Sequence, residues 1–235
     1  MTKADPEIKA DVVIIGAGLA GMTAAYSAHE QGAGVVLVDR GAIGTGTNSA
    51  MSNGRFAGPT ADYSIARFIQ DIRQTGRGIN SEKMVHQVAA EAPSAFRHLQ
   101  SIGLELDVFY DHYFYKSSRP DVMRGTSLTR KMAQILRSLE RVRMVTGFYA
   151  TDILKSESGV AGVQGFDANG RPLSLAAPAV VLATGGGGAV YLRNDNQKSM
   201  MGQGYYLAAK AGLELWDMEF VQFYPIVLAE PRVSC

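Results

Sequence analysis

The sequence predicts an α/β fold in which a parallel central sheet is accompanied by a small antiparallel β-meander. Residues 12–15 (VVII) and 35–38 (VVLV) are continuous apolar runs on either side of an alanine-rich helical stretch, as in a β-α-β unit. Residues 179–183 (AVVLA) form a third run of this kind. Across residues 144–175 the pattern changes to period two, which is typical of consecutive antiparallel strands.

A glycine-rich turn joins the first apolar run to the helical stretch. Gly16, Gly18 and Gly21 have the spacing G-x-G-x-x-G, and the second run ends on Asp39. The first glycine permits the tight turn, the second lets a pyrophosphate approach the backbone, and the third allows close helix–strand packing. The N-terminus of the helix favours the phosphates through its unpaired N–H groups and its dipole. Asp39 can accept hydrogen bonds from both ribose hydroxyls, which requires a free 2′-hydroxyl. The pattern therefore predicts NAD or FAD rather than NADP.

The next segment, residues 41–59 (GAIGTGTNSAMSNGRFAGP), is a polar loop with few residues that could build a core. Loops of this length inside a compact domain are usually functional or disordered. We expect this loop to lie along an extended cofactor, with hydrogen bonds from Asn48, Ser49, Ser52 and Asn53. A disordered connector is the alternative interpretation.

Apolar residues at helical spacing predict several helices beyond this loop. They cover residues 61–75, 81–102, 128–140 and 205–211. Pro93 predicts a kink or a break in the second of them, and Thr126 or Ser127 is the expected N-cap of the third.

The period-two region predicts four consecutive strands. They cover residues 144–149, 151–157, 160–167 and 171–175. Asn169-Gly170 is a hairpin signal between two of them. The apolar run 179–183 is expected to be a buried strand and leads into Thr184-Gly185. Two strands that end in glycines place a ligand crevice at the carboxyl edge of the sheet.

Composition excludes several classes of function. The net charge of +1 gives no reason to expect a nucleic acid or an acidic membrane as partner. The only cysteine is Cys235, so neither a disulfide framework nor a thiolate metal site is expected, and we predict no metal. No apolar run approaches the roughly 18 residues of a membrane span. We therefore expect a cytoplasmic protein that acts on a small-molecule substrate.

Five motifs follow one another between residues 11 and 225: VVIIGAGLAG, VVLVDRG, TNSAMSNG, VVLATGGGG and GQGYYLAAKAGLELWDMEFVQFYP. With them the chain resembles the flavoprotein subunit of the succinate dehydrogenase and fumarate reductase family, which also contains aspartate oxidase and ketosteroid dehydrogenases. The resemblance implies a Rossmann-like FAD-binding domain over residues 1–235. It also implies hydride transfer at flavin N5, to or from an activated C–C bond of a carboxylate or ketone substrate.

The resemblance implies roles for individual residues. Ala150 matches a backbone position beside the adenine, and Gln203 stands where the family usually has an aspartate between two glycines. Tyr224 replaces a substrate-binding histidine and is the candidate substrate contact, while the catalytic residues stay unassigned. The implied cofactor-binding residues are Gly16, Ala17, Gly18, Leu19, Ala20, Gly21, Asp39, Arg40, Thr47, Asn48, Ser49, Ser52, Asn53, Gly54, Ala150, Ala183, Thr184, Gly185 and Gln203.

Two departures from the family pattern lead to further expectations. Residues 41–59 contain no histidine to attach the flavin, so non-covalent FAD is expected. Family members continue into a capping domain with a catalytic arginine, so we expect this chain to need a missing C-terminal half. The alternative is a non-catalytic flavin-binding or electron-transfer subunit that works with a redox partner subunit. An NAD-binding dehydrogenase is a further alternative, but the loop over residues 41–59 has no role in such an enzyme.

Overall fold

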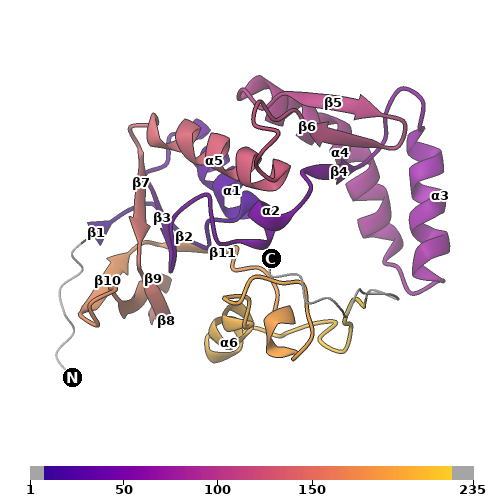
Figure 1. The fold of residues 1–235 in the computed structure, drawn as a ribbon. Coiled ribbons are helices and arrows are strands. Elements are labelled where there is room, and N and C mark those ends of the chain that lie inside the picture. The colour runs from indigo at the N-terminus through magenta and orange to yellow at the C-terminus, as the bar shows by residue number, and fades with distance from the viewer. Residues whose placement is uncertain (1–7, 224–235) are drawn as a thin grey trace.

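The computed structural model describes residues 8–223, and these form an α/β fold around a parallel sheet (Figure 1). Its strands are ordered β11–β2–β3–β7, all parallel, with Ile14 of β2 opposite Leu37 of β3 and Val181 of β11. Their bounds are Val12–Ile15 (β2), Val35–Asp39 (β3), Val142–Thr146 (β7) and Ala179–Leu182 (β11). The predicted fold class is confirmed.

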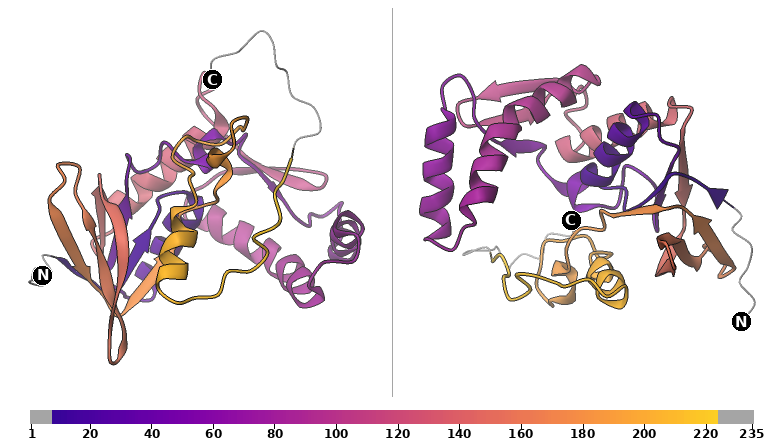
Figure 2. Two further views of the ribbon diagram at one scale, coloured as in Figure 1. Left: turned by 90° about the horizontal axis from the view of Figure 1, so that it is seen from below. Right: turned by 180° about the vertical axis from the view of Figure 1, so that it is seen from behind.

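Both faces of the parallel sheet are covered, which explains why β2 and β3 are apolar throughout. Ile14 and Leu37 pack towards α1 (Leu19–Glu30) and α5 (Arg124–Arg137) in one core. Val13 and its neighbours pack in a second core against the other sheet. Figure 2 shows the parallel sheet between the helices and this second sheet. The expected burial of β11 is wrong, because β11 lies at the edge of the sheet and Val181 is 37% exposed.

The second sheet contains the predicted meander, with β8, β9 and β10 pairing antiparallel and β1 added parallel to β10. Their bounds are Ile8–Lys9 (β1), Tyr149–Ser156 (β8), Gly159–Phe166 (β9) and Pro172–Ala176 (β10). Gly170 has φ +77° in the predicted hairpin turn. The strand expected over residues 144–149 is present as β7, but its placement in the meander is wrong, because β7 pairs with β3 in the parallel sheet. It also ends before Gly147, whose φ is +70°.

A third unit lies beyond α5 and carries its own small sheet, ordered β4–β6–β5. Phe96 of α4 stacks on Phe56 of β4 and Tyr113 of β6, with ring centroids 5.9 and 4.2 Å apart. The elements are β4 (Arg55–Ala57), β5 (Leu106–Phe109), β6 (His112–Tyr115), α3 (Ile65–Gly76) and α4 (Glu82–Ser101). A kink or a break was predicted at Pro93; the break is wrong, because α4 continues through this residue as one helix. Buried residues on both sides of the proline, among them Ala89 and Phe96, hold α4 as one element.

The loop over residues 41–59 is more structured than expected. It contains α2 (Asn48–Met51), whose N-cap Thr47 accepts a hydrogen bond from the Ala50 N–H at 3.2 Å. It ends in β4, which pairs with β6. The connector interpretation is therefore wrong. The N-cap expected at Thr126 or Ser127 is also wrong: α5 begins at Arg124, because its first turn packs against this loop.

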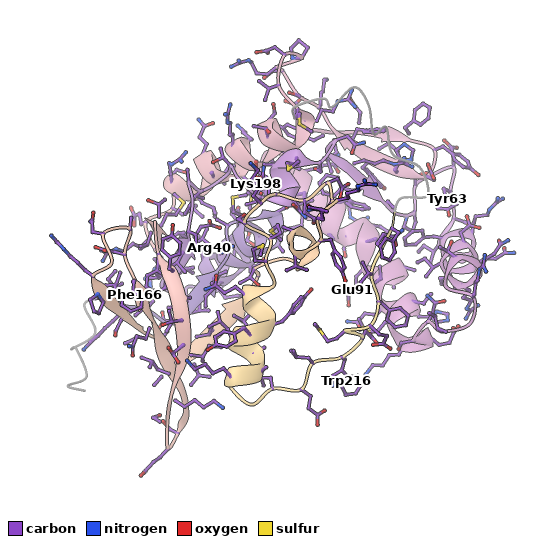
Figure 3. All side chains as sticks on the ribbon, turned by 60° about the horizontal axis from the view of Figure 1, so that its bottom comes forward. Arg40, Tyr63, Glu91, Phe166, Lys198 and Trp216 are labelled. Carbon is purple, nitrogen blue, oxygen red and sulfur yellow. The ribbon has the colours of Figure 1, made fainter. Side chains whose placement is uncertain are left out.

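The chain continues through a 3₁₀ turn (Gly188–Val190) to α6 (Gln203–Lys210). Residues 213–223 then run along the surface, where Trp216 is 78% exposed at the lower edge of Figure 3. Within residues 8–223, no helix is both long enough and apolar enough to cross a membrane.

One buried hydroxyl joins the loop to α5. Thr129 is fully buried, and its Oγ1 lies 2.8 Å from the carbonyl oxygen of Gly44 and 3.0 Å from that of Gly125. Thr129→Val keeps the shape of the side chain and leaves the Gly44 carbonyl without this donor. We expect it to lower the free energy of unfolding by about 1–3 kcal/mol in urea denaturation. The control Thr45→Val removes a hydroxyl bonded in an exposed turn and is expected to change stability by less than about 0.5 kcal/mol. Equal effects of the two substitutions would contradict this account.

Candidate dinucleotide-binding site

A cavity of about 210 Å³ lies at the carboxyl ends of β2, β3 and β11. Fourteen of the nineteen residues predicted to bind the cofactor line it. They are Gly16, Ala17, Gly18, Ala20, Asp39, Arg40, Thr47, Asn48, Ser49, Ala150, Ala183, Thr184, Gly185 and Gln203. The structure thus brings residues from six separate stretches of the chain to the edge of the sheet where a ligand was expected.

The other five predicted residues do not line the cavity. Leu19 packs against the core, and Gly21 packs against the glycine turn. Ser52, Asn53 and Gly54 lie further along the loop, where the Ser52 carbonyl accepts a hydrogen bond from the Gly125 N–H at 2.9 Å.

Sequence reasoning missed several residues of the cavity wall. They are Ile15, Gly46, Phe148, Ser199, Met200, Met201 and Gly202. Five of them could have been found, because each stands within two residues of a predicted position: Ile15, Gly46, Phe148, Met201 and Gly202. Ser199 and Met200 carry no comparable signal.

The three glycines of the turn are required for different reasons. Gly16 has φ +107°, and a Cβ there would lie 2.3 Å from the Ala183 carbonyl oxygen. A Cβ on Gly21 would lie 1.9 Å from the Gly16 carbonyl oxygen. Gly18 has φ −71°, and the nearest atom to a Cβ there is the Ser49 Oγ at 3.4 Å, an ordinary contact. The fold therefore requires glycine at positions 16 and 21, whereas at position 18 the protein itself leaves room for a side chain.

The turn also presents free hydrogen-bond donors. The Ala17 N–H donates to Asp39 at 2.7 Å, and the Leu19 N–H donates to the Ser49 Oγ at 3.1 Å. Within the described part of the chain, the N–H groups of Gly18 and Ala20 have no protein acceptor. Both residues line the cavity at the N-terminus of α1, whose dipole attracts negative charge. Phosphate oxygens fit this arrangement.

Asp39 lies beside the turn at the tip of β3. Its Oδ2 accepts from the Ala17 N–H and its Oδ1 accepts from the Gly41 N–H, at 2.7 and 2.8 Å. An ionised carboxylate has about four acceptor positions, so each oxygen keeps one for a ligand. The two backbone bonds fix the carboxylate at the edge of the cavity, where it can accept from ribose hydroxyls.

Residues 199–203 line the opposite wall, and we call residues 196–203 the wall segment. The Arg40 guanidinium donates to the Ser199 carbonyl oxygen at 2.5 Å. The Asn48 amide bonds to Asn196 at 2.6 Å and accepts from the Gln197 N–H at 2.9 Å. In Figure 3 Arg40 lies near the middle of the view, on the side of the loop that carries Lys198, and its side chain is partly buried. These bonds connect the wall segment to the loop that follows β3.

The wall segment continues into α6, which is held on β8. The Gln203 amide donates to the Ala150 carbonyl oxygen at 2.5 Å, and Lys210 forms an ion pair with Asp152. The hydrogen bond from Lys210 holds the pKa of Asp152 below its ordinary value of 3.8. The ion pair therefore contributes to stability at neutral pH, and this contribution is lost as the pH falls through the lowered pKa.

Two further predictions concern chemistry outside this cavity. Tyr224, the candidate substrate contact, lies outside the described residues. Among residues 8–223 there is no group of three or more His, Cys, Asp and Glu side chains placed to hold a metal ion.

Comparison with known proteins agrees with a flavin site. The family model described as FAD binding domain matches residues 11–234. L-aspartate oxidase from Agrobacterium fabrum is 35% identical over 234 residues, which cover 94% of this chain and 44% of that protein. The chain thus spans less than half the length of this curated relative.

Solved structures have the same fold. Sdh1 from Mycobacterium smegmatis, in complex with UQ1, matches with a TM-score of 0.76 and 26% identity over 86% of this chain and 38% of that chain. A 3-ketosteroid-delta4-(5alpha)-dehydrogenase from Rhodococcus jostii matches with a TM-score of 0.79 over 90% of this chain and 55% of that chain. Its 17% identity shows similarity of fold alone.

The family model covers nearly the whole chain, and the alternative of an NAD-binding dehydrogenase is therefore wrong. The resemblance to flavoproteins is confirmed by the relatives and by the solved structures. The chain belongs to the FAD-binding domain family, and its cofactor is FAD.

Proposed function

We propose that residues 8–223 hold FAD without a covalent link, as part of an oxidoreductase that transfers hydride between flavin N5 and an activated C–C bond. The observation that carries the proposal is the turn at Gly18, which combines free N–H groups with space that the protein leaves unfilled. A dinucleotide pyrophosphate needs both. The histidine-free loop supports a non-covalent site.

The cavity residues divide by the part of the cofactor that they suit. The N–H groups of Gly18 and Ala20 suit the pyrophosphate, and Asp39 suits the adenosine ribose. Ala150 and Gln203, which bond to each other, suit the adenine end. At about 210 Å³ the cavity is smaller than the roughly 300–1,000 Å³ typical of ligand pockets, so it accounts for the adenosine and phosphates only.

The remaining part of the cofactor is expected to follow the loop towards Ser52, Asn53 and Gly54. When bound, FAD supplies the hydride acceptor or donor. The residues of this chain bind the cofactor, orient it and keep water from its phosphates. The substrate is a small molecule, either a carboxylate or a ketone, and the name of the aspartate oxidase relative favours a carboxylate. A further segment or a redox partner subunit would supply the groups that transfer protons.

Substitutions at Gly18 and Gly21 should affect FAD binding and folding separately, because a side chain has room at Gly18 and none at Gly21. Gly18→Ala places a methyl group where the pyrophosphate approaches, so FAD affinity should fall at least tenfold while stability changes by less than about 0.5 kcal/mol. Gly21→Ala creates a backbone clash and should lower the free energy of unfolding by about 1–3 kcal/mol. Equilibrium titration with FAD and urea denaturation measure the two effects. A Gly18→Ala variant that binds FAD as tightly as the native chain would contradict the proposed pyrophosphate site.

The link between protein and flavin is tested by acid precipitation of the purified protein. We expect yellow FAD in the supernatant and none on the pellet, because residues 41–59 contain no histidine. Flavin that stays with the denatured protein would show a covalent bond. A purified protein that takes up NAD and no FAD would overturn the proposed function itself.

A further inference from the structure

Residues 189–200 form a loop whose two ends lie together. The Ala189 N–H donates to the Met200 carbonyl oxygen at 3.0 Å, so the backbone leaves and returns at one place. Of these twelve described residues, Met200 is the only buried one, and Leu192 is 98% exposed. Compact surface loops with joined ends are frequently functional. This loop, on which Lys198 is labelled in Figure 3, has little apolar packing to hold it on the protein.

Glycines stand on both sides of this loop. Gly185 precedes it with φ +74°, and Gly202 follows it with φ +75°. A Cβ built on Gly187 would lie 3.4 Å from the Gly202 Cα, so the two stems of the loop pack backbone against backbone. Glycine accepts a wide range of φ and ψ values, and hinges are a few residues at the ends of a moving element. The stems are therefore suited to rotation of the loop as one piece.

The chain beyond the second stem is anchored in the fold. Leu207 of α6 is 1% exposed. Gln203 bonds to the Ala150 carbonyl oxygen, and Lys210 forms its ion pair with Asp152, so both ends of α6 are held on β8. A movement of the loop would therefore stop at the stem and leave α6 in place.

Polar contacts near solvent join the loop to the opposite wall of the cavity. Arg40 donates to the Ser199 carbonyl oxygen at 2.5 Å, and the Ser199 hydroxyl lies 3.4 Å from the Gly46 carbonyl oxygen. Ser199 lines one wall of the cavity, whereas Arg40, Gly46 and Asn48 line the other. These contacts therefore cross from wall to wall.

Asn48 makes two of the contacts with one side chain. Its Nδ2 donates to the Asn196 Oδ1 at 2.6 Å, and its Oδ1 accepts from the Gln197 N–H at 2.9 Å. Asn48 is exposed, so water can replace both partners when the contacts open. Hydrogen bonds that exchange with water contribute little net stability. The carboxamide of Asn48 thus holds the loop in a way that is easily reversed.

We propose that the 189–200 loop is a gate over the cavity, with Asn48 as its latch, and that it opens on its glycine stems to admit and release FAD. The cavity of about 210 Å³ holds only part of this cofactor, so walls that are joined across it obstruct the passage of the whole molecule. Asn48, one of the residues predicted to bind the cofactor, is then a positioning residue that acts through the loop. The inference rests on the proposed function, because it assumes that FAD occupies this cavity.

A gate has a kinetic signature that an ordinary contact with the cofactor lacks. The latch must break before FAD enters and again before FAD leaves. Loss of the latch therefore raises both the association rate and the release rate, and the Kd changes little. Loss of a direct contact with FAD raises the release rate alone and raises the Kd with it.

The test measures FAD association and release by stopped-flow flavin fluorescence with the full chain. Asn48→Ala removes both contacts of the latch, and we expect both rates to rise about threefold or more while the Kd changes less than about threefold. Asn196→Ala removes one of these contacts and should raise both rates by a smaller factor. In the double variant the Asn196 substitution should add less than it does alone. The control Gln87→Ala removes an exposed amide bonded to Glu91 within α4 and should leave both rates unchanged.

The latch is also tested without the cofactor, by amide hydrogen exchange of Gln197 in the FAD-free protein. We expect faster exchange in Asn48→Ala, because the Gln197 N–H loses its acceptor. A residue that only contacted FAD would not change this exchange. Unchanged exchange would overturn the latch. If Asn48→Ala does not fold, Asn196→Ala tests the gate through the two rates.

The outcomes separate the gate from the proposed function. Faster release with unchanged or slower association would make Asn48 an ordinary FAD contact and overturn the gate. Rates that Asn48→Ala leaves unchanged, or that Gln87→Ala raises equally, would also overturn it. In each of these cases FAD still binds and the proposed function stands. A native chain that takes up no FAD would overturn the proposed function and the gate together.

Discussion

The rest of the structure depends on the close backbone contact between the glycine turn after β2 and Ala183, the residue that follows β11. A Cβ on Gly16 would collide with the Ala183 carbonyl oxygen, and one on Gly21 would collide with Gly16 itself. This contact sets the height of α1 above the sheet. The same turn places Gly18 and Ala20, whose N–H groups have no acceptor within residues 8–223, at the cavity, so one turn serves both the fold and the binding of a ligand.

A second close contact extends the site away from the sheet. A Cβ on Gly125 would lie 2.4 Å from the carbonyl oxygens of Ser49 and Ser52, so α5 can approach the loop only because this residue is glycine. Thr129 supports the same contact from within α5. The Gly125 contact therefore holds the middle of the loop against α5, while the Ser49 Oγ joins the loop to the glycine turn by accepting from the Leu19 N–H.

The sequence predicted the parts of the fold and site that are local in the chain. The turn of Gly16, Gly18 and Gly21 and the acid at Asp39 need no distant partner to be recognised, and fourteen predicted residues line the cavity. The start of α5 could not be predicted, because its first turn is set by the distant loop rather than by a capping side chain. Ser199 was missed for a similar reason: its contact with Arg40 joins residues 159 positions apart.

The central claim is that the free N–H groups of the glycine turn bind the pyrophosphate of FAD. Amide hydrogen exchange of residues 16–21, measured with and without FAD, tests it most directly. The account predicts that the amides of Gly18 and Ala20 exchange much more slowly when FAD is bound. Unchanged exchange at these two amides, in a protein that demonstrably carries FAD, would contradict the account and place the cofactor elsewhere.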